Sequence, residues 1–199
     1  MDVTDTRSPG RPRQFDEEVA LDQITDVFWE QGFGATTVTD LVEATGVHKP
    51  SLYRTFGSKD ELFARVLRRY IAARMGAMST RIEAAGSGVE GLHRFLQEIR
   101  NDLVDGVASR GCLLIASSCE LHGTAEGFED FGAAYRTAVR DVVRPLVVSI
   151  GGAEHTIEQR TSVLVTWMFG LDVTVRGGAP TVEIDTVIAA MEAIVAQWE

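Results

Sequence analysis

Residues 46–63 read GVHKPSLYRTFGSKDELF, and this stretch contains the starts of two helices. Pro50 suits the first turn of a helix, because its missing N–H has no partner to lose there, and it predicts a short helix over about residues 49–56. Residues 58–61, SKDE, form a capping box and predict that a longer helix begins at Lys59. The cationic side chains of the stretch, all of which precede its first acidic residue, are Lys49, Arg54 and Lys59.

The residues before this stretch predict two further helices. Apolar residues recur at helical spacing from Asp16 up to Gly32, where the pattern ends. Residues 37–40, TVTD, match a capping box in form and start a second helix, which stops at Gly46. A turn of roughly three residues then leads into the short helix described above, so the three helices have a helix-turn-helix outline.

The rest of the chain is helical in its apolar spacing and shows no alternating strand pattern, so the predicted fold is all-α. Within residues 155–176, the stretch 163–171 is apolar almost all round, and residues 181–198 carry one continuous apolar stripe. Two adjacent helices this apolar need a partner, and a second copy of the same pair is the simplest one. The residues expected at this dimer interface are Leu164, Met168, Leu171, Ile184, Val187, Ile188, Met191 and Val195.

The chain is acidic, with 29 acidic and 19 basic residues among 199 and a formal net charge of −10. Residues 1–75 hold twelve acidic and ten basic side chains, whereas residues 76–199 hold seventeen and nine, so the acidity belongs mainly to the C-terminal part. No apolar run is long enough to span a bilayer, and the N-terminus lacks the hydrophobic core of a signal peptide. A cytoplasmic protein without a membrane partner is therefore expected.

Residues 35–63, ATTVTDLVEATGVHKPSLYRTFGSKDELF, resemble the N-terminal helix-turn-helix of TetR/AcrR-type transcriptional regulators. The likeness covers about residues 15–65. It is carried by Thr36, Thr37, Asp40, Leu41, Gly46, Val47, Leu52, Tyr53, Phe56, Lys59, Leu62 and Phe63.

This resemblance implies a homodimer that binds a palindromic double-stranded operator and needs no cofactor. It divides the chain into a helix-turn-helix DNA-binding domain at residues 15–60 and a larger helical domain at residues 61–199, which binds a small molecule and dimerises. Residues 1–14, rich in Pro, Gly, Arg and Ser, are expected to form a flexible basic arm.

Two residues depart from the family pattern at the start of the third helix. His48 stands where a Ser or Thr cap is usual, and histidine is a poor N-cap. Pro50 replaces a commoner small residue and removes one backbone donor to phosphate. Neither change breaks the motif, but both leave the base contacts open.

The expected DNA contacts follow from the way in which a recognition helix enters the major groove with its N-terminal residues towards base edges. Lys49 and Arg54 can each donate to guanine or only to phosphate, and both roles stay open. The residues expected to face DNA from this helix and its start are His48, Lys49, Pro50, Ser51, Tyr53, Arg54 and Thr55.

Further contacts are expected from flanking elements. Thr37 and Lys59 lie at helix N-termini, which favour an anion such as phosphate. The resemblance makes the Tyr53 hydroxyl a phosphate contact as well. Arg11 and Arg13, in the run GRPR, either reach the minor groove or the backbone, or belong to a disordered tail.

The C-terminal domain offers aromatic and aliphatic walls for a pocket, although stripes at helical spacing are more often plain core. Cys112 and Cys119 lie seven residues apart on one expected helix, about 10 Å from each other, which is too far for a disulfide. They are expected to be buried, with a redox or electrophile sensor as the alternative, and Cys119 with His122 supplies too few ligands for a metal site. The residues expected at an apolar or aromatic ligand are Phe95, Ile99, Cys112, Cys119, His122, Phe131, Tyr135 and Trp167.

The leading hypothesis is a ligand-released, DNA-binding repressor. An activator, or a sensor acting through Cys112 or Cys119, is the alternative. A helical enzyme would need a nucleophile and base, a phosphate-binding loop or a dinucleotide motif, and the sequence has none of these, so no enzyme is expected. A third class is an adaptor that binds protein through its acidic C-terminal half.

Overall fold

The structure, a computed structural model, describes residues 15–104, 106, 110–121 and 129–198. Across these residues every regular element is a helix, which confirms the all-α prediction. None of the described helices has both the length and the apolar character needed to cross a membrane. The helices are α1 (Glu17–Ala35), α2 (Val38–Thr45), α3 (Lys49–Phe56), α4 (Lys59–Ala85), α5 (Gly88–Val104), α6 (Leu113–Leu121), α7 (Glu129–Val148), α8 (Glu154–Arg176) and α9 (Thr181–Val195).

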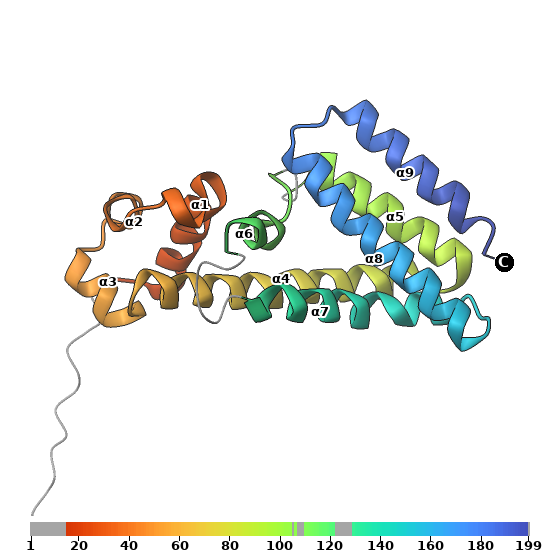
Figure 1. Cartoon of the computed structure of the whole chain (residues 1–199), viewed down its shortest axis with the longest axis horizontal. Coiled ribbons are helices and arrows are strands. Elements are labelled where there is room, and N and C mark those ends of the chain that lie inside the picture. Colours follow the sequence, from red (N-terminus) through yellow and green to blue (C-terminus); the bar gives the residue numbers. More distant parts are fainter. Residues whose placement is uncertain (1–14, 105, 107–109, 122–128, 199) are drawn as a thin grey trace, which may run out of the picture.

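The elements form two groups joined by one long helix. Figure 1 shows α1, α2 and α3 at one end of the molecule, α5, α8 and α9 at the other, and α6 between them. Helix α4 starts beside α3 and runs along the molecule as far as α5 and α7. It has 27 residues and passes through Gly76 without a break, so the group that carries α3 is continuous with the larger one.

The small group packs around an aromatic cluster. The Phe63 ring of α4 is fully buried, with its centroid 4.7 Å from that of Phe28 and 4.8 Å from that of Phe33. Leu52 and Phe56, four residues apart on α3, are buried on the inner face of that helix. Apolar residues at helical spacing thus fix both the direction of α3 and the side that it presents to solvent.

In the larger group, α5 and α7 pack against α4, α8 packs on α7, and α9 packs on α5. Its fully buried side chains include Leu92, Phe95, Leu96 and Leu164. Polar contacts at the edges tie the helices together in pairs, such as Arg100 of α5 with Asp185 of α9 at 2.6 Å. The core of this group is therefore built by one chain alone.

The position of the dimer-interface residues in this core corrects the sequence prediction. Val187 is half-buried and the other seven residues are buried within the single chain. An apolar stripe shows only that a helix is covered on that side, and here α7 covers α8, α5 covers α9, and α8 and α9 also pack on each other. The large apolar residues that α8 and α9 leave exposed are different ones, namely Val163, Val173, Val182 and Ile194.

Two glycines provide a test of this fold, because replacing each by alanine is expected to change the free energy of unfolding in opposite directions. Gly46 ends α2 with φ of 66°, a left-handed conformation that costs an L-residue about 1–2 kcal/mol. Gly76 is exposed inside α4 with open space around a Cβ, so alanine gains about 1 kcal/mol of helix propensity there. In urea denaturation, Gly46→Ala should lower the free energy of unfolding and Gly76→Ala should raise it. Shifts of the same sign would contradict the assigned backbone conformations.

Candidate nucleic-acid interface and inner cavity

The starts of α2 and α3 are set by their caps. Thr37 and Asp40 form the expected capping box, with the Asp40 carboxylate accepting from the Thr37 N–H at 2.7 Å. This hydrogen bond lowers the pKa of Asp40 below its ordinary value of 3.8. His48 makes no side-chain cap, but its carbonyl accepts from the Ser51 and Leu52 N–H groups at 2.8 and 3.1 Å. Helix α3 therefore begins at Lys49 as expected, despite the poor cap.

The outer face of α3 carries the residues expected to meet DNA. His48, Lys49, Pro50 and Arg54 are exposed, and Tyr53 is 42% exposed. The half-buried Ser51 and Thr55 belong to the same surface at its edge. The structure thus brings these seven predicted residues together on one short helix and its cap.

Three acidic residues of α1 form ion pairs with arginines of α4. Arg65 pairs with Glu17 at 3.1 Å, and Arg69 pairs with Glu18 at 3.0 Å and Asp22 at 2.6 Å. Such partly exposed pairs add little to stability. Their consequence for the surface is that the negative charge of α1 is partly offset within the protein.

The cations of α3 have no such partner. Among the described residues, neither Lys49 nor Arg54 forms an ion pair, and α3 itself contains no acidic residue. The Lys49 ammonium lies 5.7 Å from the centroid of the Tyr53 ring, and Arg54 Nη2 donates to Ser51 Oγ at 3.2 Å. Positive charge is therefore exposed on α3 although the chain is acidic.

Lys59 has a role within the protein besides the one predicted. Its ammonium donates to the carbonyl oxygens of Phe33 and Thr36, at 2.8 Å each, and lies 4.3 Å from the centroid of the Phe33 ring. These carbonyls belong to the end of α1 and to its C-cap. Two of the three donors of this ammonium thus hold the corner between α1 and α2, and a phosphate contact at Lys59 stays a prediction.

The remaining predicted DNA residues are placed as follows. Thr37 is exposed at the start of α2, where its own capping box occupies its hydroxyl. Backbone N–H groups at the first turns of α2 and α4 stay candidates for phosphate. Arg11 and Arg13 lie outside the described residues.

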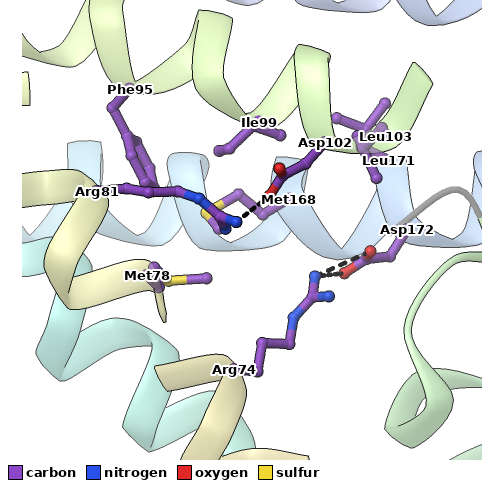
Figure 2. A pocket seen from close by; sticks show the side chains of 10 residues that line it. All are labelled: Arg74, Met78, Arg81, Phe95, Ile99, Asp102, Leu103, Met168, Leu171 and Asp172. Carbon is purple, nitrogen blue, oxygen red and sulfur yellow. Dashed lines mark hydrogen bonds and ion pairs between the residues drawn. The ribbon is translucent and has the colours of Figure 1, made fainter. Parts of the chain in front are cut away.

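A cavity lies in the larger group between α4, α5 and α8 (Figure 2). Of the eight residues expected at a ligand, only Phe95 and Ile99 line it. Its polar members are two ion pairs that sequence reasoning missed, Arg74 with Asp172 at 2.9 Å and Arg81 with Asp102 at 2.5 Å. No local motif marks such pairs, because their partners are 98 and 21 residues apart in the chain.

The other expected ligand residues are spread over the domain. Cys112 is 1% exposed, and its Sγ lies 3.5 Å from the Tyr135 hydroxyl, so it is buried as expected. Phe131 and Trp167 are half-buried and pack against the core from separate helices. His122 and the side chain of Cys119 lie outside what the structure describes.

Arg110, just before α6, joins the two groups of helices. Its guanidinium donates to Asp26 at 2.7 Å and lies 4.6 Å from the centroid of the Trp29 ring, both on α1. Its carbonyl accepts from Arg176 at the end of α8. A displacement of α8 or α6 would therefore be transmitted to α1 through the contacts of Arg110.

The comparisons with known proteins agree with this arrangement. Residues 20–66 match the family described as "Bacterial regulatory proteins, tetR family". The uncharacterized HTH-type transcriptional regulator YezE of Bacillus subtilis is 34% identical over 56% of this chain and 57% of its own length. The HTH-type transcriptional repressor ComR of Escherichia coli is 37% identical over 55% of this chain and 52% of its own length. The chain thus matches about half the length of these curated relatives.

A solved structure extends the likeness over the whole chain. It is a cysteine mutant of the TetR family transcriptional regulator CifR, complexed with 26bp double-strand operator DNA. The TM-score is 0.78 at 27% identity, covering 95% of this chain and 100% of CifR. Residues 20–66 thus match the TetR family model, and the fold over 95% of the chain is similar to that of the TetR family regulator CifR.

Proposed function

We propose that the chain is a transcriptional repressor that binds a palindromic operator as a homodimer and acts in the cytoplasm. The observation that carries this proposal is that Lys49 and Arg54 are exposed on the outer face of α3 and form no ion pair with any described residue. A recognition helix needs such donors for guanine edges and phosphate. Net charge matters less, because charges more than about 10 Å away are largely screened at ordinary salt.

Dimerisation is proposed through the outward faces of α8 and α9. Val163 and Val173 are exposed on α8, about 80° apart around its axis, and Val182 and Ile194 are exposed on α9. Scattered exposed valines are normal, but four on two adjacent terminal helices suit an isologous contact with a second copy. Such a dimer would present two α3 helices to the two halves of a palindrome.

Release from DNA is proposed to follow binding of a small molecule in the cavity between α4, α5 and α8. Helix α4 joins this cavity to the helix-turn-helix, and Arg110 adds a second connection to α1. The molecule must favour one arrangement of these helices over the other, since equal affinity for both shifts nothing. Ligand binding in the cavity would then affect DNA binding through α4 and the Arg110 contacts, which connect the two groups of helices.

The alternatives have less support. Cys112 is almost inaccessible, which disfavours a sensor of electrophiles at that thiol, and nothing described bears on Cys119. An activator would use the same DNA contacts and stays an alternative. The described residues contain no group of three or more His, Cys, Asp or Glu that could hold a metal ion.

Lys49 and Arg54 are expected to differ in their roles at DNA. Lys49 is at the N-terminus of α3, which faces base edges, so Lys49→Ala should relax the preference at one operator position by about 1–3 kcal/mol. Arg54 is in the last turn, so Arg54→Ala should weaken binding to all sequences and lower the salt slope by about 1. Gel shifts with operator variants at several salt concentrations measure both, with Arg136→Ala on α7 as the charge-matched control. If Arg54→Ala changed the base preference and Lys49→Ala lowered the salt slope, the two roles would be reversed.

Lys59→Met should act on stability and leave the ionic component of DNA binding intact. The change keeps the apolar stem over Phe33 and removes two charge-assisted hydrogen bonds, each worth about 1.5–3 kcal/mol in comparable sites. The free energy of unfolding in urea should fall, while the salt dependence of operator affinity stays that of the native chain. Unchanged stability with a salt slope lower by about 1 would restore the phosphate assignment.

Val163→Glu should dissociate the dimer, because it places like charges within an apolar contact related by a two-fold axis. Val148→Glu makes the same change at an exposed residue at the end of α7 and is the control. Sedimentation equilibrium should show a dimer for the native chain and the control, and a monomer for Val163→Glu over the micromolar range. A native monomer at those concentrations would argue against the proposed interface.

A further inference from the structure

The cavity between α4, α5 and α8 combines an apolar wall with charged groups. It encloses about 50 Å³, room for a few water molecules. Figure 2 shows the side chains of α4 extending towards α5 and α8 across this space. The apolar wall consists of Met78, Phe95, Ile99, Leu103, Met168 and Leu171.

The charged groups are the two ion pairs. Arg74 Nη2 donates to both oxygens of Asp172, at 3.0 and 2.9 Å. Arg81 lies seven residues further along α4, on the same face, and pairs with Asp102 of α5. The Arg74 pair is the more buried, with the Asp172 side chain only 5% exposed.

The two kinds of charge are not equivalent. A guanidinium stays protonated in proteins, whereas a buried carboxyl group can take up a proton. Burial raises the pKa of Asp172, and this outweighs the opposing effect of Arg74. In addition, Arg74 Nε is buried without a hydrogen-bond partner among the described residues. The cavity thus holds a guanidinium with an unsatisfied donor, and it faces a carboxylate whose burial disfavours its charged form.

We propose that the cavity binds a small apolar carboxylic acid whose carboxylate replaces Asp172 on the guanidinium of Arg74. This rests on the proposed function and names the class of its small molecule. A guanidinium and a carboxylate match in shape and can form two parallel hydrogen bonds. The apolar body of the acid would lie against Met78, Phe95 and Met168, and the two methionines can adapt to its outline.

Binding of such an acid has a mechanical consequence. The Arg74–Asp172 pair joins α4, which leads to the helix-turn-helix, to α8, which carries part of the proposed dimer face. An acid larger than a few water molecules enters only if these helices move apart. It therefore binds the arrangement in which the pair is open, and shifts the population towards it.

Calorimetric titration of the full chain with benzoate tests the class of ligand. Benzyl alcohol and benzylamine have the same ring with a neutral and a cationic head. Benzoate should bind at least tenfold more tightly than either. Absence of benzoate binding, or equal binding of benzylamine or benzyl alcohol, would overturn the proposal.

Variants of the ion pair test the site. Asp172→Asn removes the internal competitor for Arg74, so benzoate should bind about tenfold more tightly and should raise the melting temperature more than in the native chain. Arg74→Gln combined with Asp172→Asn keeps a neutral polar pair and should lose that gain, whereas Arg136→Gln, an exposed site on α7, should behave as native. No gain in Asp172→Asn, or native benzoate affinity in the double variant, would contradict the assignment of Arg74.

Operator binding by the same preparations separates this proposal from the one on which it rests. The native chain without benzoate should bind a selected operator, and benzoate should weaken that binding at least tenfold. If the chain binds the operator but not benzoate, and benzoate leaves operator binding unchanged, only the proposal of a carboxylic acid ligand is rejected. If the chain binds benzoate but no operator, the ligand assignment of the cavity is retained and the proposed repressor function is rejected.

Discussion

The junction of α1 with α4 is the contact on which the DNA-facing surface depends. Phe63 of α4 packs against Phe28 and Phe33, and Lys59 at the start of α4 holds the carbonyls at the end of α1. Aromatic contacts of this kind add about 0.5–1.5 kcal/mol beyond the burial of their area. Because α2 follows directly from the corner that Lys59 holds, and α3 follows from α2, the direction of α3 is set by this junction.

The distribution of charge follows from the same packing. Arg65 and Arg69 of α4 pair with three carboxylates of α1, whereas Lys49 and Arg54 of α3 form no ion pair with any described residue. A chain with a net charge of −10 can thus expose a cationic helix without being basic overall. The acidic remainder should weaken non-specific attraction to DNA, so that affinity relies on the contacts of a well-placed α3.

Local patterns predicted the elements of the small domain well, because caps and breakers act within a few residues. The boxes at 37–40 and 58–61 and the proline at position 50 gave the starts of α2, α4 and α3 within one residue. Sequence reasoning failed where a side chain meets a partner far along the chain. The ammonium of Lys59 donates to the carbonyls of residues 33 and 36. The apolar stripes of α8 and α9 are buried by other helices of the same chain. The pair of Arg74 with Asp172 left no trace in periodicity or spacing.

The central claim is that this acidic chain reads a palindrome through two copies of α3. A titration of the native chain against a palindrome that it selects from random DNA, with a scrambled duplex of equal composition as reference, tests this most directly. The account predicts two chains or a multiple of two per palindrome, an affinity at least about 10³-fold above that for the scrambled duplex, and weaker binding as salt rises. Equal affinity for the two duplexes, or no binding at low salt, would contradict it.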